Sequence, residues 1–313
     1  ALRAREAGEV LALPAEPAAA LAQEQSLPLW LSRGLFQWCG PDQAERVARA
    51  FNQVPPLDLR VNRLRSTPDR AAALFAERGI ATAPIADCRD GLQVLEPSGD
   101  LRRWPGFSEG YWCVQDRAAQ WVTPLLDPSP GQRVLDACAA PGGKATHLAE
   151  LMGDEGEIWA VDRSPGRLQR VAANAARLGC SSIQALASDA SQLAQERPEW
   201  SGRFDRILVD APCSGLGTLA RHPDARWRVT EESVADLLKL QIELLNGLRS
   251  LLAPGGRLVY ATCTIHPSEN TEQIHSWLQA HPDLVLNSEQ QRWPDPSGGD
   301  GFYAAVITAP AAA

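Results

Sequence analysis

The residues of this sequence best suited to covalent chemistry are two cysteines and one aspartate. Cys213 lies three positions after Asp210, and Cys263 stands between Thr262 and Thr264. Both cysteines follow apolar stretches that are typical of buried strands. A thiolate is a strong nucleophile, and a carboxylate beside it can hold or share a proton during the reaction. We therefore expect Cys213, Cys263 and Asp210 to take part in covalent catalysis.

Four other cysteines are interpreted as small buried apolar residues, which is the usual role of a lone cysteine. These are Cys39, Cys88, Cys113 and Cys180. The seven cysteines are odd in number and include no C-x-x-C pair, which disfavours a disulfide framework or a zinc site. We therefore predict no metal centre, and free thiols favour a location in the reducing cytoplasm.

A glycine-rich turn after another apolar stretch is the candidate cofactor site. It consists of Cys138, Ala139, Ala140, Pro141, Gly142, Gly143 and Lys144. Glycines let a ligand approach the backbone closely, and the start of the following helix offers free N–H groups. The turn matches neither the dinucleotide fingerprint nor the P-loop pattern.

Two carboxylates extend this candidate cofactor site. Asp162 ends the next apolar stretch, where a carboxylate commonly accepts hydrogen bonds from ribose hydroxyls. Asp189 follows a third stretch and is placed to accept a hydrogen bond from an adenine amino group. Each alone is equally well read as a strand-end cap, but together they favour a nucleoside-bearing cofactor. Because the dinucleotide fingerprint is missing, S-adenosylmethionine is preferred over NAD.

The elements that must position these residues form a regular alternation in the second half of the chain. Strands are expected at residues 133–137, 157–161, 183–187, 204–209 and 256–262, with helices at 142–152, 164–178 and 231–252. Fully apolar strands alternating with helices indicate a parallel sheet covered on both faces. Ligands bind at the carboxyl ends of such strands, where the candidate residues are found.

The first part of the chain is organised differently. Residues 1–25, which include an Ala/Pro-rich stretch, are interpreted as a flexible linker, and residues 26–56 as a helical segment. Residues 57–125 alternate short strands with one helix and are interpreted as a small α/β module. Residues 126–313 then form the domain with the parallel sheet.

Composition narrows the class of protein without deciding it. The chain has 313 residues, of which 44% are hydrophobic and 22% charged, as in soluble globular proteins. No apolar run reaches the roughly 18 residues of a membrane span, and the first residues do not form a secretory signal. The initial Ala hints at a fragment or a processed product. A net charge of −8 argues mildly against nucleic acid, although local patches decide such binding.

Taken together, these motifs resemble the Sun/Fmu and nucleolar-protein family of RNA cytosine-5 methyltransferases, above all its bacterial branch acting on 16S ribosomal RNA. The resemblance extends from about residue 26 to 303. It is carried by LRVN (59–62), VQD (114–116), DACAAPGGK (136–144), DAPCSG (210–215), RHPD (221–224), YATCT (260–264) with EN (269–270), and DGF (300–302). The resemblance implies a Rossmann-like class I methyltransferase domain, whose mostly parallel seven-stranded sheet has helices on both faces. A small α/β RNA-binding module precedes that domain in the family.

The resemblance also assigns a role to each candidate residue. Cys263 is the nucleophile that attacks carbon 6 of cytosine, so that carbon 5 can accept the methyl group. Cys213 helps to release the product, and Asp210 contacts ring nitrogen 3. The cofactor contacts map to residues 138–144, Asp162, Arg167, Asp189 and Asp210. Arg167 matches a contact found in only part of the family.

RNA, and specifically 16S ribosomal RNA, is the partner that the resemblance implies. The antitermination-factor-like helical domain that usually begins the bacterial proteins is not recognised in this sequence, and a monomer is expected. In the small module, Arg60, Arg63, Arg65 and Arg70 are candidates for phosphate contacts or for an ordinary solvated surface. The segment 221–228, with three arginines and Trp227, is a further candidate for phosphate binding and base stacking, although Trp227 also suits a purely structural role.

Three other functions remain open at this stage. Transfer RNA is an alternative substrate for the same chemistry. A DNA cytosine-5 methyltransferase would use the cysteine of a Pro-Cys motif, here Cys213, as the attacking group. A ribosome-assembly factor would bind RNA on this fold without catalysis.

Overall fold

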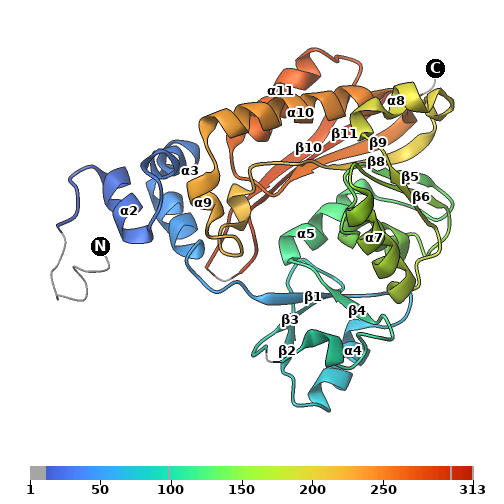
Figure 1. The fold of residues 1–313 in the computed structure, drawn as a ribbon, viewed down its shortest axis with the longest axis horizontal. Coiled ribbons are helices and arrows are strands. Elements are labelled where there is room, and N and C mark those ends of the chain that lie inside the picture. Colours follow the sequence, from blue (N-terminus) through green and yellow to red (C-terminus); the bar gives the residue numbers. More distant parts are fainter. Residues whose placement is uncertain (1–11, 98, 297, 312–313) are drawn as a thin grey trace.

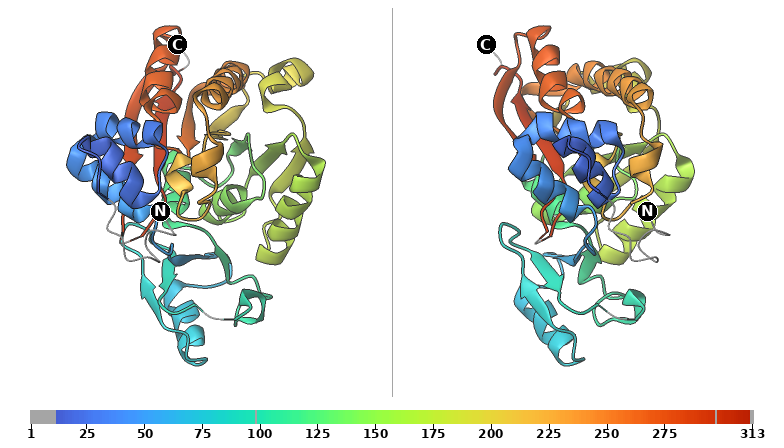
Figure 2. Two further views of the ribbon diagram at one scale, coloured as in Figure 1. Left: turned by 60° about the vertical axis from the view of Figure 1, so that its left-hand side comes forward. Right: turned by 90° about the vertical axis from the view of Figure 1, so that its left-hand side faces the viewer.

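The computed structural model describes residues 12–97, 99–296 and 298–311, which form a helical segment, a small sheet and a large α/β domain (Figure 1). The small sheet and the helical segment contact different parts of the large domain, as two further views show (Figure 2). Within the described ranges, no helix is both long and apolar enough to cross a membrane.

The helical segment consists of α2 (Pro17–Gln25) and α3 (Leu29–Ala50). The prediction of a flexible linker over residues 1–25 is wrong for the residues of α2, while residues 1–11 lie outside the described part. Leu21 is buried in the core that α2 shares with α3, and the Ser32 hydroxyl donates to the Ala18 carbonyl at 2.7 Å. Alanine favours helix, and these contacts with α3 supply the stability that the sequence pattern did not reveal.

The small sheet has the strand order β2-β3-β1-β4 among the described residues, and every neighbouring pair is antiparallel. Its strands are β1 (Leu57–Val61), β2 (Thr82–Pro84), β3 (Gly91–Val94) and β4 (Trp112–Val114). Helix α4 (Pro68–Ala76) begins after Thr67, whose side chain accepts from the Arg70 amide. It packs Phe75 against Trp112 on one face of the sheet.

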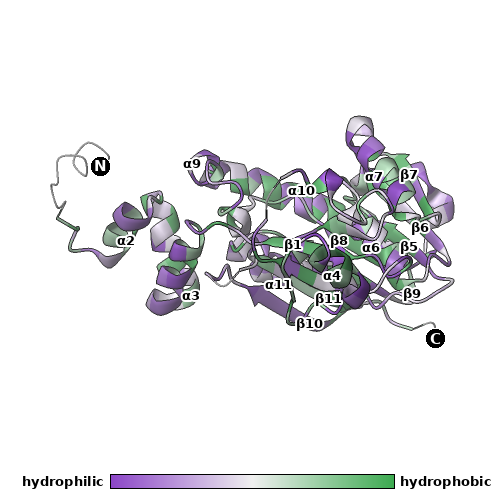
Figure 3. Ribbon diagram, turned by 90° about the horizontal axis from the view of Figure 1, so that it is seen from below, coloured by the Kyte–Doolittle hydropathy of each residue, from purple (hydrophilic) through white to green (hydrophobic). Residues whose placement is uncertain are grey.

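The large sheet has the order β10-β11-β9-β8-β5-β6-β7 in the described part of the chain. Its strands are β5 (Arg133–Asp136), β6 (Glu157–Asp162), β7 (Ile183–Ala187), β8 (Phe204–Asp210), β9 (Leu252–Thr262), β10 (Val285–Arg292) and β11 (Phe302–Thr308). The strands from β9 to β7 are parallel, whereas β11 runs antiparallel to β9 and to β10. This confirms the expected mostly parallel seven-stranded sheet. Strand β10 forms one edge of the sheet and is hydrophilic, as suits an edge strand (Figure 3).

Helices cover both faces of the large sheet, and each face has its own hydrophobic core. One core includes residues of α5 (Arg117–Val122), α6 (Gly143–Leu151) and α7 (Pro165–Leu178). The opposite core includes residues of α8 (Leu193–Glu196), α10 (Glu231–Arg249) and α11 (Thr271–Gln279). Ser164 and Gly179 cap α7 at the expected positions.

Short helices complete the chain. Helix α9 covers Ala225–Arg228, and 3-10 helices occupy Leu101–Arg103, Thr123–Leu126, Ala190–Gln192, Pro198–Trp200, Leu216–Thr218 and Pro267–Glu269. Helix α5 contributes Ala118 and Val122 to the core of the large sheet, whereas Arg117 at its start pairs with Asp58 of the small sheet. The two units thus meet at α5, and the boundary expected at residue 126 stays a prediction.

Candidate active site

A cavity of about 270 Å³ opens at the carboxyl ends of β5, β6 and β8. The predicted site residues that line it are Cys138, Ala140, Asp162, Arg167, Asp210, Cys213 and Cys263. Leu240 and Leu244 of α10 supply an apolar wall. The structure thus gathers residues that lie up to 125 positions apart in the sequence around one space.

The glycine-rich turn that borders this cavity is tightly built. The Ala139 amide donates to the Val161 carbonyl at 2.8 Å, which ties the turn to β6. Gly142 has a φ of 104°, and a Cβ atom there would lie 3.0 Å from the Cα of Val171 in α7. Cys138 and Ala140 line the cavity, whereas the other predicted residues of the turn do not: Ala139, Pro141, Gly142, Gly143 and Lys144. Glycine is therefore required at position 142 both for backbone conformation and for packing.

Asp162 and Arg167 are linked to each other and to the turn. Asp162 accepts from the Ser164 amide at 2.9 Å, and its other oxygen lies 3.3 Å from Arg167 Nη1. Arg167 Nη2 donates to the Ala140 carbonyl at 2.8 Å. The Asp162 side chain is 5% exposed, and this exposed part faces the cavity. Arg167 thus fixes the carboxylate relative to the turn.

Asp189 lies beside the cavity rather than in its wall, although its neighbours Ser188 and Ala190 line it. The Asp189 carboxylate accepts from the Ser191 amide at 3.0 Å and from Arg163 at 2.7 Å. Burial alone would raise the pKa of Asp189, but the hydrogen bonds from Ser191 and Arg163 outweigh burial and lower it. In this structure Asp189 acts as a cap, and its charge is maintained at neutral pH.

Lys144 and Asp210 form an ion pair at the active edge, with 2.6 Å between Nζ and Oδ2. The ammonium also lies 5.3 Å from the centroid of the Phe302 ring. Burial alone would lower the pKa of Lys144, but the Asp210 carboxylate raises it above its ordinary value. The Lys144 ammonium is thus a proton donor directly beside Asp210, the carboxylate that was predicted to contact ring nitrogen 3 of the cytosine.

The two cysteines predicted to react, Cys213 and Cys263, are in contact, with their Sγ atoms 3.4 Å apart. Cys213 follows β8 and Cys263 follows β9, and these strands are hydrogen-bonded neighbours. The hydrogen bond with Cys263, together with burial, raises the pKa of Cys213 well above its ordinary value. The raised pKa keeps the Cys213 thiol protonated at neutral pH.

The buried carboxylate of Glu269 holds the loops of both cysteines, and it was not among the predicted site residues. It accepts from the Ser214 amide at 2.8 Å, from the Ser214 hydroxyl, and from Gln241 Nε2 at 3.0 Å. The Ser214 hydroxyl also lies 2.7 Å from Thr264 Oγ1, next to Cys263. The pair Glu269-Asn270 was recognised as a motif, but nothing in its sequence indicated Ser214 as the partner.

Asp136, at the end of β5, is a second site residue that the sequence analysis did not assign. Its side chain is fully buried, and within the described residues neither carboxylate oxygen has a partner in hydrogen-bonding geometry. Burial and the Asp210 carboxylate raise the pKa of Asp136 to about 7, despite the opposing effects of Lys144 and the Cys138 amide. The motif that contains it was a signal of its importance.

Most of the arginines proposed to contact phosphate are engaged within the protein. Arg60 is fully buried, so its interpretation as a phosphate contact is wrong. Arg63 lies 3.6 Å from Asp90, Arg65 donates to the Glu109 carbonyl, and Arg70 lies over the Tyr111 ring.

The segment 221–228 is also more structural than expected. Arg221 pairs with Asp116 and Asp300, and Arg226 is buried. Trp227, by contrast, is 62% exposed, which excludes the interpretation as a buried structural tryptophan.

The cavity suits a nucleoside-bearing cofactor. A buried carboxylate at Asp162 can accept from ribose hydroxyls, and the apolar wall from α10 can pack against an adenine ring. Among the residues that the structure describes, no group of three or more His, Cys, Asp or Glu side chains is arranged to hold a metal ion.

Comparison with known families agrees with this geometry. Residues 123–308 match the family described as 16S rRNA methyltransferase RsmB/F. The chain belongs to this family. Residues 27–100 match the ferredoxin-like domain of the RsmF/B-like methyltransferases, which covers part of the helical segment and most of the small sheet.

Individual relatives support the same assignment. The chain is 45% identical over 89% of its length to a probable ribosomal RNA small subunit methyltransferase B of Synechocystis sp., and covers 61% of that protein. It is 42% identical over 90% of its length to ribosomal RNA small subunit methyltransferase B of Serratia proteamaculans, and covers 66% of it. The chain therefore spans slightly less than two thirds of these curated relatives. A methyltransferase homolog protein from Pyrococcus horikoshii superposes on 95% of the chain and 100% of its own, with a TM-score of 0.83 and 26% identity.

Proposed function

We propose that this protein methylates carbon 5 of a cytosine in 16S ribosomal RNA, with S-adenosylmethionine as methyl donor. The observation that carries the proposal is the contact between Cys213 and Cys263 beside the Lys144–Asp210 pair, at the mouth of one cavity. Family membership and the names of the curated relatives favour small-subunit ribosomal RNA over transfer RNA as substrate.

The first chemical step assigned to the chain is attack by the Cys263 thiolate on carbon 6 of the cytosine. A bond forms between Sγ and carbon 6, and the electrons displaced toward ring nitrogen 3 require a proton. The Lys144–Asp210 pair supplies that proton, since Asp210 is expected to face nitrogen 3. The Lys144 ammonium lies 2.6 Å from the Asp210 carboxylate. Carbon 5 of the adduct is then nucleophilic.

S-adenosylmethionine, when bound, supplies an electrophilic methyl group on its sulfonium, which suits the nucleophilic carbon 5. Asp162 is assigned to hold the nucleoside of this cofactor. The turn at residues 138–144 is assigned to hold the part of the cofactor that lies against the protein backbone. Arg167 maintains their spacing through Asp162 and Ala140. Asp189 is assigned a supporting role, because its carboxylate already caps the chain after β7.

Release of the product requires that the carbon 5 proton leaves to a base and that the bond between Cys263 and carbon 6 breaks. Cys213 is assigned to this release step, because its thiol is in contact with the sulfur that departs. A protonated Cys213 can donate to the departing Cys263 thiolate and thereby stabilise it as a leaving group. The role of attack therefore goes to Cys263, in contrast to the DNA-type arrangement.

The proposal is tested with the wild type, Cys263→Ala, Cys213→Ala and, as a control, Cys39→Ala. Each is incubated with tritiated S-adenosylmethionine and unmodified small-subunit ribosomal RNA, and both label transfer and denaturant-stable RNA adducts are measured. We expect Cys263→Ala to lose about 10⁴-fold or more in activity and to form no adduct, as for loss of other covalent nucleophiles. Cys213→Ala should accumulate the adduct, and Cys39→Ala should behave as wild type, since Cys39 lies in α3.

Three results would count against the proposal. An adduct that survives in Cys263→Ala but disappears in Cys213→Ala would reverse the two roles. Failure of the wild type to transfer label to ribosomal RNA, combined with transfer to transfer RNA, would change the substrate. Failure to bind S-adenosylmethionine at all would favour the RNA-binding factor without catalysis.

A further inference from the structure

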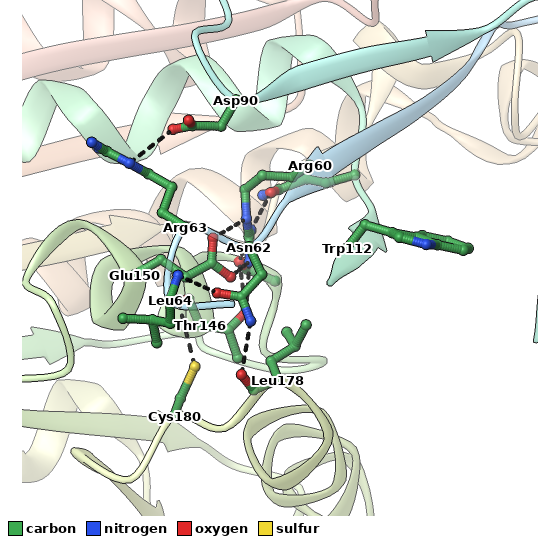
Figure 4. Close-up of polar contacts among 12 residues, drawn as sticks. Arg60, Asn62, Arg63, Leu64, Asp90, Trp112, Thr146, Glu150, Leu178 and Cys180 are labelled. Atoms are coloured by element: carbon green, nitrogen blue, oxygen red, sulfur yellow. Dashed lines mark hydrogen bonds and ion pairs between the residues drawn. The ribbon is translucent and has the colours of Figure 1, made fainter. Parts of the chain in front are cut away.

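The guanidinium of Arg60 lies fully buried between the small sheet and α6 of the large domain (Figure 4). Arg60 belongs to β1, the strand that pairs with both β3 and β4. Helix α6 begins at Gly143, within the turn assigned to the cofactor. The side chain therefore joins the two folding units at the point where the candidate cofactor site starts.

Arg60 contacts α6 at three residues, which lie on successive turns of the helix. Nε and Nη2 donate to the two oxygens of Glu150, at 3.0 and 2.8 Å, in a bidentate pair. Nη2 also donates to Thr146 Oγ1 at 2.9 Å. Nη1 donates to the Gly143 carbonyl at 2.6 Å and to the Gln115 side chain. One planar group thus fixes the first residue and the last turn of α6 relative to β1.

Packing alone does not explain an ion pair in this position. Removing an arginine and a glutamate from water costs several kcal/mol each, and apolar residues of similar volume often replace such pairs without loss of stability. Both side chains here are completely buried. A rigid fork of donors differs from an apolar filling chiefly in that it fixes direction and distance. In this protein the Arg60 guanidinium fixes the position of the Gly143 carbonyl.

We infer that Arg60, together with Glu150, is a positioning residue for the cofactor turn, and that it sets cofactor affinity from the small sheet. The inference rests on the proposed function, because it takes residues 138–144 as the cofactor turn. Thr146 Oγ1 also donates to the Gly142 carbonyl at 2.8 Å, so the contact of Arg60 with Thr146 extends to a second residue of the turn.

The inference is tested by measuring the binding of S-adenosylhomocysteine to the full chain by calorimetry, together with thermal stability. The variants are Arg60→Lys, Glu150→Gln and the apolar double variant Arg60→Met/Glu150→Met. Arg117→Lys is the matched control, because Arg117 forms a comparable pair with the buried Asp58 and no hydrogen bond to the turn. Steady-state kinetics with ribosomal RNA then separate the KM for the cofactor, the KM for RNA and kcat.

We expect Arg60→Lys and the double variant to weaken S-adenosylhomocysteine binding by about tenfold or more, as for lost hydrogen bonds to a charged group. The double variant should regain most of the thermal stability without regaining affinity. Arg117→Lys should lower stability and keep wild-type affinity. In kinetics, the KM for the cofactor should rise much more than the KM for RNA.

Wild-type affinity in Arg60→Lys, or affinity that follows stability through all four variants, would overturn the inference and leave the proposed function intact. Failure of the wild type itself to bind S-adenosylhomocysteine would overturn the assignment of the turn, and with it both proposals.

Discussion

Asp136 differs from the other carboxylates of the active edge in its lack of stabilising contacts. Asp162 and Asp189 accept amide hydrogen bonds, and Asp210 pairs with Lys144. Asp136 is fully buried, and among the described residues its oxygens find no partner in hydrogen-bonding geometry. Burial is the largest effect on its pKa; Asp210 and Asp162 also raise this pKa, whereas Lys144 and the Cys138 amide lower it.

The ionisation of Asp136 predicts a pH-dependent loss of stability in the free protein. Its pKa is raised from 3.8 to about 7 by folding, so the folded state binds the proton more tightly than the unfolded state. The contribution to stability is complete below about pH 4 and is lost as the pH rises to about 7. Asp136→Asn should therefore gain about 1–3 kcal/mol over wild type at alkaline pH and little at acidic pH.

Thermal unfolding of both proteins across this pH range measures the effect, with Asp127→Asn as an exposed control. A difference between Asp136→Asn and wild type that stays constant with pH would show that Asp136 is ionised throughout, or neutral throughout.

At this scale the sequence predicted the residues that line the cavity better than those that hold them in place. Cys213 and Cys263 were predictable because each directly follows an apolar strand, and parallel strands end at one edge. Glu269 and Arg60 were not, because their partners lie 55 and 90 residues away and no local pattern marks a buried ion pair. Arg60 was even assigned to the surface, since arginine is rarely buried.

At the scale of elements, the helical segment is joined to the loop that follows Cys213. Arg226 of α9 donates to the carbonyls of Gln25, Ser26 and Phe51, and to the side chain of Asn52. These acceptors lie at the ends of α2 and α3. The same contact region contains a hydrophobic core that combines residues of α2, α3 and the loop. The helical segment therefore supports the loop that follows Cys213.

Replacing Arg226 should loosen this support. Arg226→Met leaves the buried Phe51 carbonyl without its donor, at a cost of about 1–3 kcal/mol. The acceptors on Gln25, Ser26 and Asn52 are partly exposed to water, and their loss of a donor costs less. We expect faster proteolysis within residues 17–56 and a lower unfolding temperature. Arg228→Met is the matched control two residues away, because its pair with Asp224 is exposed on both sides and contributes at most about 1 kcal/mol. Equal effects of both variants would argue against a supporting role for the segment.

The five parallel strands of the large sheet were predictable to within a few residues, whereas α2, β10 and β11 were not. The α2 sequence was interpreted as a linker because alanine and proline are also typical of linkers, and only its packing on α3 distinguishes them. Strands β10 and β11 were expected from the family alone. The hydrophilic sequence of β10 resembles a loop, and its pairing with β11 is what makes it a strand.

At the scale of the whole molecule, the small sheet meets the large domain along the end of α7. Asn62 donates to the Gly110 carbonyl at 2.8 Å and to the Leu178 carbonyl at 2.7 Å, and thus bridges the two units. Arg177 stacks on Phe107, with its guanidinium carbon 4.2 Å from the ring centroid. Because the two Asn62 hydrogen bonds are buried and directional, they fix orientation as well as distance.

At Gly110 the backbone of the small-sheet unit lies very close to the backbone of α7. A Cβ atom there would lie 2.1 Å from the Arg177 carbonyl oxygen, so any side chain must separate the two units. Gly79 has the same φ of 71°, but within the described residues nothing lies within 4 Å of its Cβ position. The two positions therefore share the backbone strain of a left-handed conformation and differ only in packing.

Gly110→Ala should consequently uncouple the small sheet from the large domain, whereas Gly79→Ala should not. Both variants incur about 1–2 kcal/mol for the left-handed backbone. Gly110→Ala incurs the additional cost of opening the junction, and we expect hydrogen exchange to increase at Asn62 and along β4. If Arg60 transmits the position of the small sheet to the cofactor turn, only Gly110→Ala should also weaken S-adenosylhomocysteine binding. Equal exchange and equal affinity in the two variants would mean that the units are held together elsewhere, and that the junction at α7 does not control the active edge.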